Sequence, residues 1–388
     1  MPALFLRNRR FQGTLFPLQF RRALNMSSSA NDADSISRRE ALTGTAAGLL
    51  ALSTGAWTPL SGSANAFSFT SFPDFFNWDI PYPQPGYEAA ITWFIETMKT
   101  QGAEFGLVAG DLMDARWRSS PGQVRQHALA YWGGWVSRME DHDFPCYVVP
   151  GDHERGDNPV KSELVPAFER AFREVFEMPG NGPPSKEGLA YHFTRGDTLF
   201  VGVDTFALQG RSVEWTVEGE QLAWFRQVLA DHKDVAHIIV QGHVPVLPKV
   251  SHRRSSKIVL AGGKGRKTAF WKAMVEGGVD VYLCGEHHDI TVTRRDGIWQ
   301  VVHGAIWGGL SPVNYLLGRV DGDTLRLELK EFPLTFSGDE IWHLNRAVGR
   351  RPQENVTVPA AVKRDGPASV GTLVRRGDED VTRTGHFR

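Results

Sequence analysis

Acidic residues and histidines follow glycine at several places in this sequence, and most of these places come directly after a short apolar run. In chain order, the set is Asp74; Gly110-Asp111-Leu112-Met113-Asp114; Gly151-Asp152-His153-Glu154; Gly242-His243; and Gly285-Glu286-His287-His288. One Gly-Asp pair is usually a turn, and one histidine after a strand is usually a buried core residue. Five places in order, four of them after glycine and Asp74 after Pro73, instead indicate one shared site. Carboxylates and imidazoles are ligands of divalent cations, so the set predicts metal chemistry.

Short strands that alternate with helices would position these residues. Apolar runs predict strands at residues 67–72, 105–109, 146–149, 236–240 and 279–284. Helical spacing of apolar residues appears at 85–100, 123–140, 160–177 and 218–231. Gly196-Asp197 predicts a hairpin turn, and a run of further strands follows residue 290. This order predicts an α/β fold with functional groups at the carboxyl ends of the strands.

The composition is that of a globular protein and excludes a disordered or fibrous one. Hydrophobic residues make up 41% of the 388 residues and charged residues 22%. The two cysteines, Cys146 and Cys284, cannot form a disulfide framework and lie within apolar runs, so we expect two buried thiols.

Residues 1–66 are expected to be a targeting leader. Ser37-Arg38-Arg39-Glu40-Ala41-Leu42 is similar to a twin-arginine export signal, and Ala64-Asn65-Ala66 fits a signal-peptidase site. The mildly apolar stretch between them is too short to span a membrane. An ordinary amphipathic or disordered leader is the alternative. The signal predicts an exported, periplasmic or extracellular protein that uses the twin-arginine export machinery and has no stable membrane insertion.

Residues 67–340 are expected to form one domain, and residues 341–388 a polar C-terminal tail with little apolar periodicity. Removing the leader also removes seven arginines and three acidic residues. The remaining chain has 36 basic and 41 acidic residues, a net charge of −5. An acidic chain is a poor binder of nucleic acid, so no nucleic-acid partner is expected.

The ordered set resembles the calcineurin-like metallophosphoesterase family over roughly residues 67–335. The family pattern is D-x-H, G-D-x-x-D, G-N-H-[ED], a histidine after glycine, and G-H-x-H. The second motif is matched by Gly110–Asp114 and the fourth by Gly242-His243. The third has Asp152 in place of Asn, and the fifth has Glu286 in place of the first His. The resemblance implies a four-layer α/β/β/α sandwich of two mixed sheets flanked by helices.

The resemblance also implies a role for each matched residue at a centre of two divalent metal ions. Asp111 would bridge the ions; Asp74 and His288 would complete one of them, and Asp152, His243 and Glu286 the other. His153 would stay off the metals, and would protonate the leaving oxygen or hold the phosphoryl oxygens. Asp114 would support the site by orienting His153 or a loop amide.

The first motif departs from the family pattern, because Phe76 occupies the position of its histidine. Asn77 or Asp79 could fill the vacant place, and Asn77 is the favoured candidate. The four carboxylates of Asp74, Asp111, Asp152 and Glu286 would neutralise two divalent ions. This oxygen-rich set predicts Mn, Fe or Mg in preference to Zn.

Arg116 and Arg155 directly follow the second and third motifs, and a guanidinium can bind a phosphate in fork geometry. Both are substrate-binding candidates, with ion-paired arginines as the alternative. The predicted reaction is hydrolysis of a small phosphomonoester or phosphodiester by a bridging hydroxide. A purple-acid-type phosphatase would need a tyrosine at Asp114, and a nuclease is disfavoured by the acidic chain. A catalytically silent relative that binds a metal or ligand is the rival from another class.

Overall fold

The computed structural model describes residues 66–75, 85–113, 117, 120–156, 160–250, 256–304, 312–337 and 355–388. The predicted leader lies outside these ranges, apart from Ala66. So do four residues named above as site candidates, which are Asn77, Asp79, Asp114 and Arg116. No helix within the described ranges is long and apolar enough to cross a membrane.

Seven strands form the first sheet, in the order β17-β16-β13-β12-β1-β2-β3. Their bounds are β1 Phe67–Ser71, β2 Phe105–Val108, β3 Cys146–Val148, β12 Val313–Asp321, β13 Thr324–Phe332, β16 Ala368–Arg376 and β17 Glu379–Gly385. β1, β2 and β3 run parallel, and the remaining four strands extend the sheet antiparallel from β1. The carboxyl ends of the three parallel strands therefore meet at one edge.

Six strands form the second sheet, in the order β10-β11-β9-β8-β5-β4. Their bounds are β4 Tyr191–Arg195, β5 Thr198–Gly202, β8 His237–Gln241, β9 Val281–Cys284, β10 Thr291–Arg295 and β11 Ile298–Val302. The four central strands are parallel, and β4 and β10 are antiparallel edge strands. The smaller pairs are β6 Phe206–Gln209 with β7 Ser212–Trp215, and β14 Thr335–Ser337 with β15 Asn355–Thr357.

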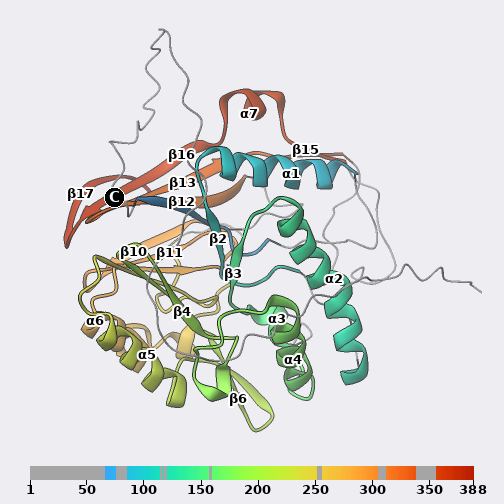
Figure 1. The fold of residues 1–388 in the computed structure, drawn as a ribbon, viewed down its shortest axis with the longest axis vertical. Coiled ribbons are helices and arrows are strands. Elements are labelled where there is room, and N and C mark those ends of the chain that lie inside the picture. The colour runs from blue at the N-terminus through green and yellow to red at the C-terminus, as the bar shows by residue number, and fades with distance from the viewer. Residues whose placement is uncertain are drawn as a thin grey trace, which may run out of the picture. The chain divides into compact units, whose positions relative to one another are not determined.

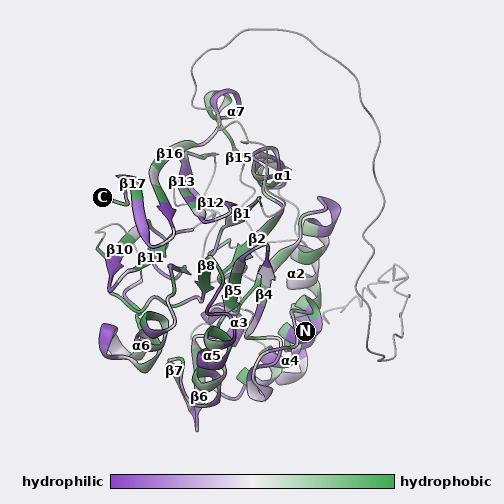
Figure 2. Cartoon of the chain, turned by 60° about the vertical axis from the view of Figure 1, so that its left-hand side comes forward, coloured by the Kyte–Doolittle hydropathy of each residue, from purple (hydrophilic) through white to green (hydrophobic). Residues whose placement is uncertain are grey.

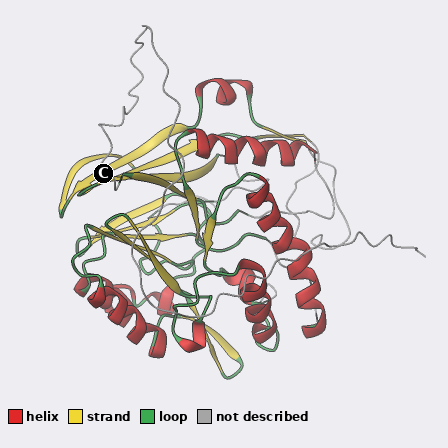
Figure 3. Cartoon of the chain, in the orientation of Figure 1, coloured by secondary structure: helices red, strands yellow, loops and turns green. Residues whose placement is uncertain are grey.

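Helices cover the outer faces of both sheets, as Figures 1 and 3 show. The longer ones are α1 Pro85–Thr100, α2 Pro121–Asp141, α4 Val165–Phe176, α5 Gly219–Asp231 and α6 Ala269–Glu276. α1, α2 and α4 pack in one hydrophobic cluster with the first sheet, and α5 and α6 in another with the second. α3 Asp152–Arg155 and α7 Ala360–Asp365 are short.

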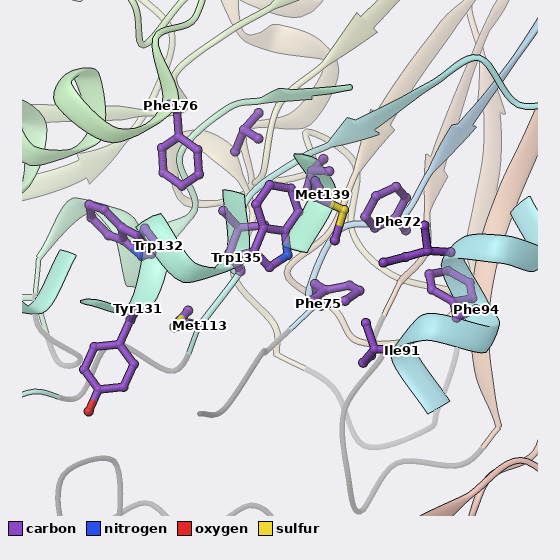
Figure 4. Packing of buried hydrophobic residues seen from close by; sticks show 14 of the residues in the cluster. Phe72, Phe75, Ile91, Phe94, Met113, Tyr131, Trp132, Trp135, Met139 and Phe176 are labelled. Carbon is purple, nitrogen blue, oxygen red and sulfur yellow. The ribbon is translucent and has the colours of Figure 1, made fainter. Parts of the chain in front are cut away.

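The outer core of the first sheet is built largely from aromatic rings. On α1, Phe94 lies edge-on to Phe72, with ring centroids 5.9 Å apart, and to Tyr315 at 5.2 Å. On α2, Trp135 is buried and lies edge-on to Phe75, the last described residue before the first gap. Figure 4 shows the rings of Phe72, Phe75, Phe94 and Trp135 lying close together between the two helices. This packing fixes the segment that carries Asp74.

A third cluster fills the space between the two sheets. Phe69 of β1 and Phe105 of β2 each lie edge-on to Phe200 of β5, at centroid distances of 5.3 and 5.5 Å. Figure 2 shows hydrophobic colour on the central strands β5 and β8. The order of layers is therefore helices, sheet, sheet, helices, and the predicted four-layer fold is confirmed.

The prediction of a polar tail after residue 340 is wrong for residues 355–388. β16 pairs with β13 along most of its length and β17 pairs with β16, so this segment completes the first sheet. In the middle of β16, the buried residues Gly371, Leu373 and Arg375 alternate with half-buried ones, and Phe387, which follows β17, is also fully buried. Only a few apolar residues of the segment, such as Val370, Leu373 and Phe387, contribute to the core, so its sequence as a whole is polar.

Removal of residues 366–388 should destabilise the protein, because it uncovers the β13 edge and apolar residues such as Leu327 that β16 and Phe387 bury. We expect a lower midpoint of thermal unfolding and stronger binding of a dye specific for apolar surface. Val381→Ala is the control, because Val381 is 57% exposed in the same segment and should leave both readouts unchanged. An unchanged midpoint in the truncated protein would contradict the role assigned to this hairpin.

Candidate metal centre

The residues predicted to bind metal come from the carboxyl ends of parallel strands in both sheets. Asp74 follows β1, Asp111 follows β2, and Asp152 begins the short helix α3 after β3. From the second sheet, His243 follows β8, while Glu286 and His288 follow β9. Their side chains meet in three overlapping groups, and within each group the donor atoms lie within 4.8 Å of one another.

The backbones of the ligand-bearing loops lie very close to one another and to the ligands. A Cβ on Gly110 would lie 2.3 Å from the backbone nitrogen of Gly151. A Cβ on Gly151 would lie 2.2 Å from Asp111 Oδ1, and one on Gly285 would lie 2.5 Å from Asp74 Oδ2. Such distances are far below van der Waals contact. Gly151 and Gly285 therefore leave the space that the carboxylates of Asp111 and Asp74 occupy, and Gly110 lets its loop approach the backbone of Gly151.

Four of the predicted ligands have left-handed backbone conformations. The φ angles are 54° at Asp74, 56° at Asp111, 68° at Glu286 and 53° at His288. Non-glycine residues rarely adopt this region, and each instance costs on the order of 1 kcal/mol. Such residues cluster at functional sites, where the surrounding structure holds them.

Asp74, Asp111 and His288 form the first group. His288 Nε2 lies 3.5 Å from Asp74 Oδ1, and the same oxygen accepts a hydrogen bond from the Glu286 backbone N–H at 3.3 Å. The backbone N–H of Asp74 donates to the carbonyl of Gly110, next to Asp111. The group therefore joins the two sheets, since Asp74 and Asp111 belong to one and His288 to the other.

Asp152, His243 and Glu286 form the second group. His243 Nε2 lies 3.0 Å from Glu286 Oε2 and 3.5 Å from Asp152 Oδ1. It is also 3.5 Å from Asp111 Oδ1. The other ring nitrogen, Nδ1, lies 2.7 Å from the carbonyl oxygen of Ala109. A proton on Nδ1 donated to this carbonyl leaves Nε2 free to bind a metal.

His153 lies between the two groups and joins Asp111 and Asp152 in the third. Its Nε2 is 3.8 Å from Asp111 Oδ2 and 3.9 Å from Asp152 Oδ1. Its backbone N–H donates to Asp111 Oδ1 at 3.3 Å. The side chain is buried, and these distances place the imidazole beside the metal-ligand cluster.

The charges of this buried cluster shift one another's ionisation. Burial, together with the Asp152 carboxylate, raises the pKa of Asp111 well above its usual value. Burial alone would lower the pKa of His243, but Asp111, Asp152 and Glu286 raise it well above its usual value. Burial opposes ionisation of Asp152, but His153 and His243 outweigh it and lower the pKa of that carboxyl. Protons thus offset part of the negative charge, and bound cations would displace them.

The cluster has the properties of a cation site. Asp74 is fully buried, and its Oδ2 has no hydrogen-bond partner in the part of the chain that the structure describes. A buried carboxylate oxygen is normally hydrogen-bonded or bound to a cation. Hard carboxylate oxygens and two imidazoles are suitable ligands for divalent ions of the first transition series or Mg²⁺. The donor set therefore fits two divalent cations.

Arg155 was expected to bind substrate, and the structure gives it other partners. Its guanidinium is buried, with Nη2 2.6 Å from Glu169 Oε1 on α4 and 3.4 Å from Asp204 Oδ2 after β5. Lys186 pairs with the same Asp204 oxygen at 2.8 Å. These contacts favour the ion-pair alternative for Arg155. Three further predictions concern residues outside the described ranges and stay predictions. They are the supporting role of Asp114, the substrate role of Arg116 and the replacement of the first-motif histidine by Asn77.

Two further buried residues, Glu154 and His303, lie beside the cluster, and the sequence alone gave neither side chain a specific role. Glu154 accepts hydrogen bonds from backbone N–H groups of both the β2 and the β3 loops. His303 Nε2 lies 3.1 Å from the Ser71 carbonyl oxygen, and burial lowers the pKa of this imidazole to about 4. The position of Glu154 in the third motif was the only sequence signal for its contribution, because the contacts themselves are tertiary.

The calcineurin-like phosphoesterase family matches residues 79–289, which is more than half of the chain. The chain belongs to this family. The matched span begins after Asp74, so the altered first motif lies outside it. No curated protein matches the chain in sequence.

Two solved structures are similar to this chain at low sequence identity. PhoD is 13% identical, with a TM-score of 0.53 over 83% of this chain and 72% of that chain. A purple acid phosphatase from yellow lupin seeds is 14% identical, with a TM-score of 0.48 over 76% of this chain. This chain covers only 54% of the lupin protein.

The close approach at Gly151 generates a specific prediction. Gly151→Ala should displace the Asp111 carboxylate, because the new methyl group would overlap Oδ1. We expect about tenfold or greater loss of Mn²⁺ affinity, measured by calorimetry. Gly133→Ala is the matched control, because Gly133 lies within α2 with nothing within 4 Å of its added Cβ. Equal Mn²⁺ affinity in both variants would show that the Asp111 position does not matter for binding.

Proposed function

We propose that this protein hydrolyses a phosphomonoester or phosphodiester at a dinuclear metal centre. The observation that carries the proposal is the set of overlapping buried donor groups that share Asp111 and Asp152. Family membership supports the reaction class, because this is a family of phosphoesterases. The substrate would be a small phosphoester, since the net negative charge of the chain without its leader disfavours nucleic acid.

Two ions would be held by the groups described above, with Asp111 between them. Asp74 and His288 would serve one ion; Asp152, His243 and Glu286 the other. When bound, two such cations clamp phosphate oxygens and lower the pKa of a water molecule toward neutrality. The residues themselves keep the donor atoms in place, because the left-handed backbone conformations and the hydrogen bond from the Glu286 N–H to Asp74 fix their directions.

His153 would act as the proton donor of the reaction. Hydrolysis forms a bond between a water oxygen and phosphorus and breaks the ester P–O bond, and the leaving oxygen takes up a proton. His153 is buried beside Asp111 and Asp152, and its backbone is tied to Asp111, which supports this role. The other two groups supply three donors each without His153, so this residue would stay off the metals.

His153→Ala provides the test of activity. With added Mn²⁺, we expect the wild type to hydrolyse p-nitrophenyl phosphate or its bis-ester. The variant should lose about 10²–10⁴-fold in kcat while its Mn²⁺ stoichiometry stays unchanged. His142→Ala is the control, because His142 lies at the end of α2 and pairs with Glu96 of α1, and neither residue belongs to the donor groups.

The results separate three roles for His153. A parallel loss of Mn²⁺ would make His153 a ligand and not a proton donor. Equal kcat in variant and wild type would remove it from the reaction. If the wild type turns over neither ester nor any other ester of a panel, while still binding metal, the catalytically silent relative becomes the better description.

The metal content is a separate prediction. Four carboxylates against two imidazoles make the proposed donor set oxygen-rich, so Mn, Fe or Mg should be favoured over Zn. Elemental analysis of protein purified from its native host should give about two such ions per chain. Two stoichiometric Zn ions would be the contrary result.

We also propose that the protein is exported through the twin-arginine pathway. The support is the sequence Ser37-Arg38-Arg39 and the cleavage-like Ala64-Asn65-Ala66. N-terminal sequencing of the protein from the exported fraction should begin at Phe67. Replacement of Arg38 and Arg39 by lysine should keep the protein inside the cell.

A further inference from the structure

The Glu154 carboxylate connects the two loops that carry the shared ligands. Its Oε2 accepts hydrogen bonds from the backbone N–H of Asp111 at 2.7 Å and of Gly151 at 2.9 Å. Its Oε1 accepts one from the backbone N–H of Leu112 at 3.0 Å. The side chain is fully buried, so these three donors replace its hydration. Both oxygens therefore act only as acceptors.

These bonds hold a backbone that would otherwise relax. Asp111 has a φ of 56°, a conformation that is unfavourable for an aspartate. Its N–H is anchored by Glu154, and its own carboxylate accepts the backbone N–H of His153 at 3.3 Å. The β2 loop and the turn of α3 thus exchange hydrogen bonds in both directions. The direction of the Asp111 carboxylate depends on this exchange.

The geometry requires a carboxylate and not merely a side chain of this size. A glutamine at 154 has one acceptor oxygen and one NH₂ group, and the NH₂ would face a backbone N–H whichever way the amide turned. Either the Leu112 N–H, or both the Asp111 and the Gly151 N–H, would then lose their acceptor. An aspartate at 154 is one methylene shorter, so it could not reach both loops without moving the helix turn.

We infer that Glu154 is a positioning residue that fixes Asp111 and the Asp152–His153 turn in the geometry that binds two metal ions. This inference rests on the metal centre of the proposed function and deepens it. Glu154 itself points at backbone N–H groups of the two loops, so its effect on the metals is transmitted through Asp111. The two ions should therefore be bound correctly only when this carboxylate is present.

Glu154→Gln in the full chain tests the inference, with Leu229→Ala as the matched control. Leu229 is buried on α5 against the second sheet, so its truncation destabilises the protein without touching the metal-ligand loops. Three readouts are compared: the unfolding midpoint without metal, Mn²⁺ binding by calorimetry, and the electron paramagnetic resonance signal of a coupled Mn pair. Hydrogen exchange of the metal-free protein adds a direct measure of the Asp111 and Leu112 amides.

In Glu154→Gln we expect Mn²⁺ binding to weaken by about tenfold or more and the coupled-pair signal to disappear. The amide hydrogens of Asp111 and Leu112 should exchange faster than in the wild type. Leu229→Ala should lower the midpoint but keep Mn²⁺ affinity and amide exchange close to wild type. The inference is overturned if Glu154→Gln binds Mn²⁺ like the wild type, or if affinity in both variants simply follows the midpoint. A wild type that binds no Mn²⁺ also overturns it. A wild type that binds two Mn²⁺ but hydrolyses no ester removes only the proposed reaction.

Discussion

Mutual repulsion among buried carboxylates is the constraint on which the rest of this structure depends. Asp74, Asp111, Asp152 and Glu286 meet at one place and are almost entirely removed from solvent. Like charges at such distances in a low-dielectric interior oppose folding unless protons, histidines or cations offset them. Burial, together with the neighbouring Asp152 carboxylate, raises the pKa of Asp111, and the surrounding carboxylates raise the pKa of His243 against the effect of its burial. Such a buried cluster lowers the stability of the folded protein without bound ions, but it leaves carboxylates positioned to bind cations.

The scaffold resists this repulsion by distributing the ligands over two sheets. β1, β2 and β3 present three carboxylates from one sheet, and β8 and β9 present the remaining ligands from the other. The aromatic contacts of Phe69 and Phe105 with Phe200 hold the sheets face to face. Because the strands are rigid and hydrogen-bonded to their neighbours, the loops at their ends cannot separate independently. The packing of the two sheets therefore limits how far the ligand-bearing loops can move apart.

The helix turn after β3 contains both residues of the candidate metal centre and residues that hold that centre in place. Four consecutive charged or ionisable residues, 152–155, are all buried, and each has a different set of partners. Asp152 and His153 face the metal-ligand cluster, Glu154 reaches the β2 loop, and Arg155 reaches α4 and Asp204. The buried ion pair of Arg155 joins α3 to elements of both halves of the domain. One turn of helix therefore contains the proposed proton donor together with the residues that orient it.

The sequence by itself determined the residue types at the strand ends and the alternation of strands and helices. Both are local properties, since glycine followed by a ligand and the period of apolar residues can be read within a few positions. Through its resemblance to a family it also gave the four-layer fold. Only the tertiary structure decided that β16 and β17 complete the first sheet and that Glu154 joins two loops. It also gave Arg155 partners on α4 and after β5. Those outcomes depend on pairing and contacts between residues far apart in the chain, and a polar residue's partner is not encoded in its immediate neighbours.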